Sequence, residues 1–118
     1  NWMARGQERI AIKAFYDMLK PGGILGVVEH RGDESVPQDP ASKSGYVNES
    51  YMVQIAKEAG FILDASSEIN ANSLDAKKHA EGVWTLGPTY RAQNDEQKKA
   101  LSKIGESDRF TLRFKKPL

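Results

Sequence analysis

The chain has 118 residues, with 17 basic and 16 acidic side chains and a net charge of +1. So balanced a charge gives no field that favours nucleic acid or an acidic membrane surface, and neither is expected as a partner. The absence of cysteine excludes disulfides, thiol catalysis and thiolate metal sites within this sequence, and no apolar run approaches the ~18 residues that cross a bilayer.

The chain opens on Asn1-Trp2 instead of methionine, and a helical pattern begins almost at once. We therefore expect a piece of a longer protein, with residues 1–118 forming one partial domain. The sequence does not decide the compartment, and the cytoplasm is only the default.

Residues 3–20 predict a helix that covers a sheet. Its apolar residues recur at three- to four-residue spacing, at Ile10, Ala11, Ala14, Phe15, Met18 and Leu19. Pro21-Gly22-Gly23 then ends this helix, because proline cannot continue it and glycine accepts the left-handed turn that follows.

The run Ile24–Val28 is apolar without alternation, which is typical of a strand covered on both faces in a mainly parallel sheet. Glu29, His30 and Arg31 follow at its carboxyl end, the edge where ligands bind in open α/β sheets. A carboxylate or an imidazole there can act as a general base, and an arginine can hold an anion. The alternative is structural: a Glu–Arg pair and a histidine bonded to a loop.

The middle of the chain predicts a loop, a helix and a strand. Residues 32–45 are rich in Asp, Ser, Pro and Gly and form either a lid or a disordered insertion. Asn48 is a good N-cap for a helix that Gly60 closes, and Phe61–Ser67 follows as a strand. Since strand, helix and strand form a crossover unit, the two strands should run parallel.

The last third predicts a long loop, a short helix and a strand. Residues 68–93 lack periodicity, Asp95–Ile104 reads as a helix, and Arg109–Lys115 alternates between apolar and polar residues. In the long loop, Trp84, with Tyr90 and Arg91 near, forms either an aromatic wall over a substrate or a pin that holds the loop. His79 lies in the same loop, but with two histidines and no cysteine in the chain a metal site is not expected.

Several short motifs, in order, carry a resemblance to a known family. They are the LKPGG helix end that feeds a buried strand at 19–28, the Ala-Gly-Phe corner at 59–61 and the closing Ser-Asp-Arg-Phe-Thr-Leu at 107–112. Together they resemble the carboxyl-terminal half of class I S-adenosylmethionine-dependent methyltransferases. The resemblance implies an α/β fold: part of a Rossmann-like sheet of three strands, two parallel and the last antiparallel between them, with about three helices.

The resemblance also implies an activity, a cofactor and a set of site residues. Methyl transfer from S-adenosylmethionine to an unidentified small-molecule substrate is expected of the intact protein, although the family's glycine loop lies outside this chain. The implied site comprises Glu29, His30 and Arg31 as catalytic residues, Asn1 and Trp2 toward the cofactor, and His79, Trp84, Tyr90 and Arg91 around the substrate.

The competing interpretation is a non-catalytic module. A strand as apolar as Ile24–Val28, left without a neighbour, would demand a partner chain, and a homodimer through that sheet edge is one solution.

Overall fold

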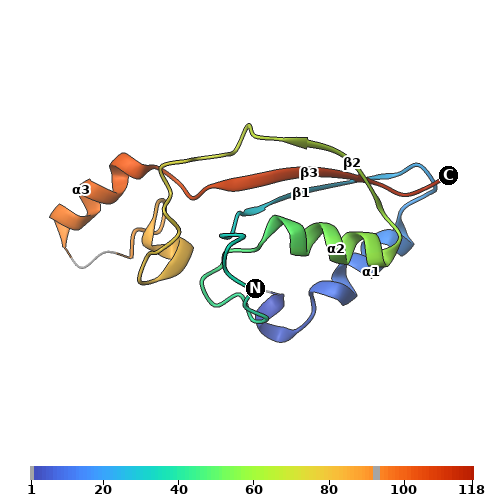
Figure 1. The fold of residues 1–118 in the computed structure, drawn as a ribbon, viewed down its shortest axis with the longest axis horizontal. Coiled ribbons are helices and arrows are strands. Elements are labelled where there is room, and N and C mark those ends of the chain that lie inside the picture. The colour runs from blue at the N-terminus through green and yellow to red at the C-terminus, as the bar shows by residue number, and fades with distance from the viewer. Residues whose placement is uncertain (1, 92–93) are drawn as a thin grey trace.

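The computed structural model describes residues 2–91 and 94–118, which extend over 53 × 28 × 25 Å (Figure 1). Within these residues the helices and strands are α1 (Glu8–Met18), β1 (Ile24–His30), α2 (Glu49–Ala59), β2 (Ile62–Ser67), α3 (Asp95–Ile104) and β3 (Arg109–Lys115). Two short 3-10 helices, η1 (Met3–Arg5) and η2 (Gly82–Thr85), complete the regular structure of the described part.

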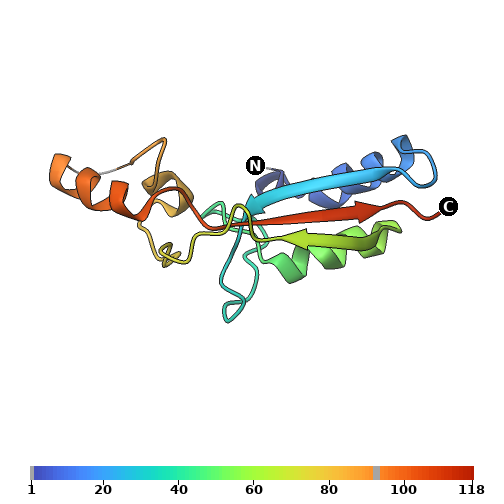
Figure 2. The same cartoon turned by 90° about the horizontal axis from the view of Figure 1, so that it is seen from above.

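The three strands form one sheet in the order β1-β3-β2, with β3 antiparallel to both neighbours (Figure 2). Leu112 of β3 lies opposite Val27 of β1 on one side and Ser66 of β2 on the other. Phe110, Leu112 and Phe114 are buried on one face of β3, as its alternation predicts. The central strand of the sheet therefore contributes three buried side chains to the core.

The expectation of a Rossmann-like sheet with two parallel strands is wrong. Both ladders of the sheet are antiparallel, and the parallel bridge between Arg31 and Val47 lies outside the named strands. β1 and β2 point in the same direction, but β3 lies between them, so they form no parallel ladder. β3 carries the buried Phe110, Leu112 and Phe114 and forms an antiparallel ladder with each neighbour, so the inner edges of β1 and β2 are both paired with β3 and not with each other.

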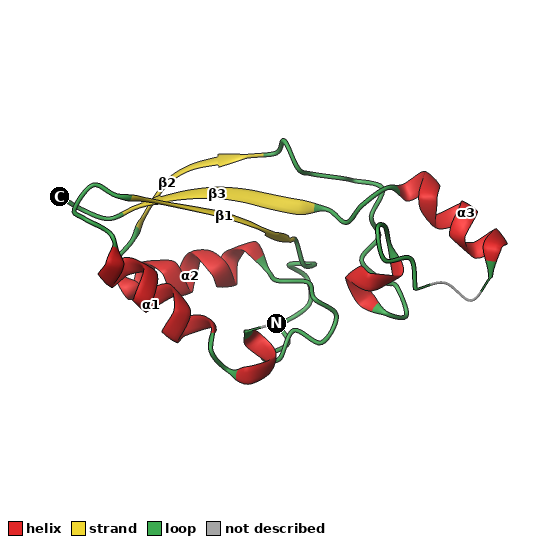
Figure 3. Ribbon diagram, turned by 180° about the vertical axis from the view of Figure 1, so that it is seen from behind, coloured by secondary structure: helices red, strands yellow, loops and turns green. Residues whose placement is uncertain are grey.

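The core lies on one face of the sheet, where α1 and α2 pack side by side (Figures 1 and 3). Ile12 of α1 and Ile55 of α2 are buried against Phe61 and the aromatic face of β3. The prediction that β1 is covered on both faces is therefore also wrong. Ile24 and Val28 are 48% and 50% exposed, because no described helix covers the other face.

Asn48 and Gly60 mark the two ends of α2. Gly60 ends α2 at φ 115°, and a Cβ there would meet the Tyr16 ring at 2.7 Å, so glycine allows α1 and α2 to approach. Asn48 stands at the N-cap position of α2 as predicted, but its side chain makes no cap hydrogen bond. Its Nδ2 donates instead to the carbonyl of Val36, which ties the loop of residues 32–45 to the start of the helix.

The segment from about residue 68 to α3 projects from the end of the sheet, away from α1 and α2 (Figures 1 and 3). The sequence predicts a long irregular loop at 68–93, and in its described part η2 is the regular element. The Val83 amide donates to the Ser44 carbonyl at 2.9 Å. This contact joins the projecting part to the loop that follows β1.

Candidate functional site

A groove of about 540 Å³ lies beside β1, on the face of the sheet that the helices cover. Three parts of the chain form its walls: the strand β1, the facing sides of α1 and α2, and the loops that carry Trp2 and Trp84. Its apolar and aromatic lining includes Trp2, Met3, Ile12, Phe15, Leu25, Val27, Tyr51, Met52, Ile55, Val83 and Trp84. Ligand sites in proteins have this size and this mainly apolar character.

Two carboxylates line the groove, Glu8 from the first turn of α1 and Glu29 from the end of β1. Burial raises the pKa of the Glu29 carboxyl above its ordinary value of 4.5, and the His30 backbone N–H and the charge of the amino terminus oppose this only in part. The Oε2 atom of Glu8 is buried and has no hydrogen-bond partner. Among the described residues, no lysine or arginine pairs with either carboxylate.

Trp2 and Trp84 both line the groove. Trp2 is 54% exposed and packs against Phe15 with 5.8 Å between the ring centroids. Trp84 belongs to η2, and a Cβ at Gly45 would lie 3.2 Å from its ring. Trp84 thus lines the groove and lies close to Gly45 in the loop before α2. That its ring covers a substrate stays a prediction.

His30 lines the groove at the carboxyl end of β1, and its ring is held by a hydrogen bond between Nδ1 and the Ser107 hydroxyl at 2.5 Å. Burial lowers the pKa of His30 below 6.5, and the positive charge of Arg109 lowers it further. The imidazole is therefore neutral near pH 7.

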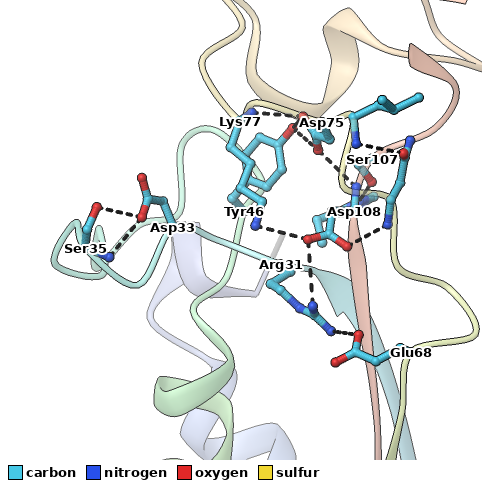
Figure 4. A network of polar contacts seen from close by, with 12 residues as sticks. Arg31, Asp33, Ser35, Tyr46, Glu68, Asp75, Lys77, Ser107 and Asp108 are labelled. Carbon is cyan, nitrogen blue, oxygen red and sulfur yellow. Dashed lines mark hydrogen bonds and ion pairs between the residues drawn. The ribbon is translucent and has the colours of Figure 1, made fainter. Parts of the chain in front are cut away.

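Arg31 takes part in a polar network rather than in the groove (Figure 4). Its guanidinium bonds Glu68 at 2.5 Å and lies 3.9 Å from the Asp108 carboxylate, which Lys77 approaches to 3.0 Å. The structural alternative for Arg31 is therefore the better description, although its partner is Glu68 and not Glu29.

Asp75 is the centre of this network (Figure 4). Its side chain is fully buried and accepts hydrogen bonds from the Tyr46 hydroxyl, the backbone N–H groups of Lys77 and Asp108, and the His79 ring. Burial alone would raise the pKa of Asp75, but these hydrogen bonds outweigh it and hold the pKa below 3.8. The pKa of Tyr46 is raised, first by burial and then by the Asp75 carboxylate.

The other loop candidates divide between two places. His79 and Arg91 line a second cavity with Lys78, Glu81, Thr85 and Leu101, away from the groove. Tyr90 packs against Gly87, and its ring lies under the Lys98 ammonium at 5.5 Å. Arg91 lies over the Trp84 ring at 5.8 Å, so it touches the groove wall from outside.

The structure thus brings Glu29, His30, Trp2 and Trp84 together and places Arg31, His79, Tyr90 and Arg91 elsewhere. The candidate Asn1 lies outside the described residues. Sequence reasoning missed Glu8 and Tyr51 in the groove and Asp75 in the network. Glu8 was detectable, because it shares a helix face with Ile12 and Phe15 at spacings of four and seven residues; nothing local marks Asp75.

Comparison with known proteins adds no relative: no family model, no curated protein and no solved structure matches this chain. Within the described residues, no three His, Asp or Glu side chains gather as metal ligands would. None of the helices described is long and apolar enough to cross a membrane.

Proposed function

We propose that this chain belongs to an S-adenosylmethionine-dependent methyltransferase and forms the part that faces the substrate. The observation that carries the proposal is the groove, which brings the Glu29 carboxylate together with Trp2 and Trp84 from three separate segments. The order of the LKPGG, Ala-Gly-Phe and Ser-Asp-Arg-Phe-Thr-Leu motifs supports the same activity.

The groove residues suit a sulfonium cofactor in one respect, since Trp2 and Glu29 offer an aromatic face and a negative charge to its cationic centre. When bound, the cofactor supplies an electrophilic methyl group. Glu29 would take the proton that the acceptor loses, and its raised pKa brings it closer to the value that suits a base near neutral pH. The apolar walls would exclude water and orient the acceptor.

The test is methyl transfer by the protein in its full length. The protein is incubated with S-adenosylmethionine carrying a labelled methyl group and a pool of small-molecule acceptors. Release of S-adenosylhomocysteine above the rate without acceptors supports the proposal. Release equal to that without protein, from a folded sample, contradicts it.

The free edge of β1 favours a second candidate, a module that associates with another copy of the chain. The hydrogen bonds from Lys116 to Gly23 and from Arg31 to Asp108 set a register in which Ile24, Gly26 and Val28 turn their backbone groups away from β3. No other described residue pairs with these groups. An unpaired edge with exposed apolar side chains is a template for another strand.

The mass of the chain in solution tests this second candidate. A dimer that Val28→Lys converts to monomer supports pairing through β1, because lysine on an edge strand opposes strand addition. Ile62→Lys is the matched control, since Ile62 is similarly exposed on β2, at the opposite edge. A wild-type monomer, or equal effects of the two substitutions, would exclude the β1 interface.

A further inference from the structure

The groove beside β1 has an unusual combination of linings. Its described residues supply two carboxylates and several aromatic rings but no lysine or arginine. The histidine present, His30, is held neutral near pH 7 by burial and by Arg109. Negative charge in the groove is therefore not balanced by any described side chain that lines it.

The Glu8 carboxylate strengthens this point. Its Oε2 atom is buried without a hydrogen-bond partner, whereas polar atoms buried in proteins nearly always have one. Glu8 lies in the first turn of α1 and lines the groove, so this oxygen can accept a charged or hydrogen-bonding group of a ligand.

The aromatic rings already attract cations from outside the groove. Arg91 lies 5.8 Å from the centroid of the Trp84 ring, and Arg9 lies 5.8 Å from that of Tyr51. Neither arginine lines the groove. Tryptophan and tyrosine faces are the surfaces that recognise alkylated ammonium groups.

We propose that the groove binds a small organic cation with apolar substituents, an alkylated ammonium or sulfonium group, between the carboxylates of Glu8 and Glu29 and the rings of Trp2 and Trp84. The argument is charge complementarity: aromatic and aliphatic walls take the alkyl groups, and the carboxylates take the charge. This inference deepens the proposed function, since an ammonium ligand is the product or substrate side of N-methylation and a sulfonium ligand is the reacting end of the cofactor.

The chain contains a built-in reporter for this binding. Its two tryptophans, Trp2 and Trp84, both line the groove, so tryptophan fluorescence reports on the groove alone. Choline and trimethylsulfonium serve as the two cationic probes, and 3,3-dimethylbutan-1-ol serves as the uncharged isostere of choline. The fluorescence of the 118-residue chain is titrated with each.

We expect at least one cation to change the fluorescence saturably, with the uncharged isostere at least about ten-fold weaker. Preference for choline assigns the groove to an amine acceptor, and preference for trimethylsulfonium assigns it to the cofactor. Glu29→Gln and Glu8→Gln should each weaken the cation by about ten-fold, whereas Glu96→Gln, on exposed α3, should not.

Equal binding of choline and its isostere, or no saturable response to either cation, would overturn the proposal, and this comparison needs no variant. The result is separable from the proposed function. Cation binding without methyl transfer by the full-length protein leaves the groove a cation site and removes the enzyme. Methyl transfer by the full-length protein without cation binding leaves the enzyme and removes the cation site.

Discussion

The Tyr46 hydroxyl lies 3.0 and 2.8 Å from the two carboxylate oxygens of Asp75, 29 residues further along the chain. Tyr46 immediately precedes Val47, whose N–H donates to the His30 carbonyl at the end of β1. Asp75 in turn accepts the N–H of Asp108, next to the start of β3. One buried carboxylate therefore connects the loop after β1, the projecting segment and the central strand.

Asp75→Asn should destabilise the fold by about 2–4 kcal/mol, because an amide group would face donors with a donor of its own and leave buried partners unpaired. Chemical denaturation measures the loss. The matched control is Asp64→Asn, where the carboxylate forms a partly exposed ion pair with Arg113, and the expected cost is about 0–1 kcal/mol. Equal costs for the two substitutions would show that the network contributes no special stability.

The same carboxylate predicts how stability responds to acid. The pKa of Asp75 in the folded chain is lower than its ordinary value of 3.8, so the folded chain binds the proton less tightly than the unfolded chain does. Its contribution is present above pH 3.8 and is lost as the pH falls toward the folded pKa. Denaturation midpoints between pH 6 and pH 2 should therefore drop more steeply for the wild type than for Asp75→Asn. Parallel curves would contradict this account.

For Glu29 we expect the opposite dependence of folding stability on pH. Burial raises its folded pKa above 4.5, so the native state binds the proton more tightly than the unfolded chain. Its contribution is most favourable below pH 4.5 and is lost as the pH rises through the folded pKa. Glu29→Gln does not titrate, so its denaturation midpoint should rise relative to the wild type between pH 4.5 and pH 7. A midpoint difference between Glu29→Gln and the wild type that does not change with pH would contradict the raised pKa of Glu29.

Replacing Gly82 with alanine should disturb the groove wall. Gly82 begins η2 at φ 58°, and a Cβ there would collide with the Ser44 backbone, so Gly82→Ala must displace Trp84 or the loop beneath it. We expect a loss of about 1–3 kcal/mol and a shift in tryptophan emission. Gly26→Ala is the control, because a Cβ there meets nothing within 4 Å. An unchanged spectrum for Gly82→Ala would mean that η2 does not position Trp84.

Much of the secondary structure is predictable from local pattern. The alternation at Phe110, Leu112 and Phe114 follows from side-chain period and is observed. On α1 the predicted apolar face is only partly right, because Ile10 and Met18 are exposed and Ile12, outside the predicted stripe, is buried. The pairing of strands cannot be predicted in this way, because it joins segments that lie far apart in the sequence. The uninterrupted apolar run of β1 suggested a covered strand, yet Ile24 and Val28 are half exposed at a sheet edge.

The sequence offered groove residues in two kinds of place: polar side chains that directly follow a strand, and the tryptophans Trp2 and Trp84 outside the strands. Glu29 and His30 come at the end of β1, and both line the groove. Arg31 is equally close in sequence, but its guanidinium bonds Glu68, 37 residues away, and therefore belongs to the polar network. Asp75 lacks any local signal, because its role arises from partners at Tyr46 and Asp108 that only the folded chain brings together.

The measurement that tests the central claim most directly is the rate of methyl transfer by the full-length protein carrying Glu29→Gln, compared with Glu96→Gln and the wild type. The account predicts that Glu29→Gln lowers the rate by about 10²-fold or more, the usual contribution of a general base, while Glu96→Gln leaves it unchanged. Equal rates for the three proteins, or no transfer by the wild type, would contradict the assignment of the groove as a methyltransferase site.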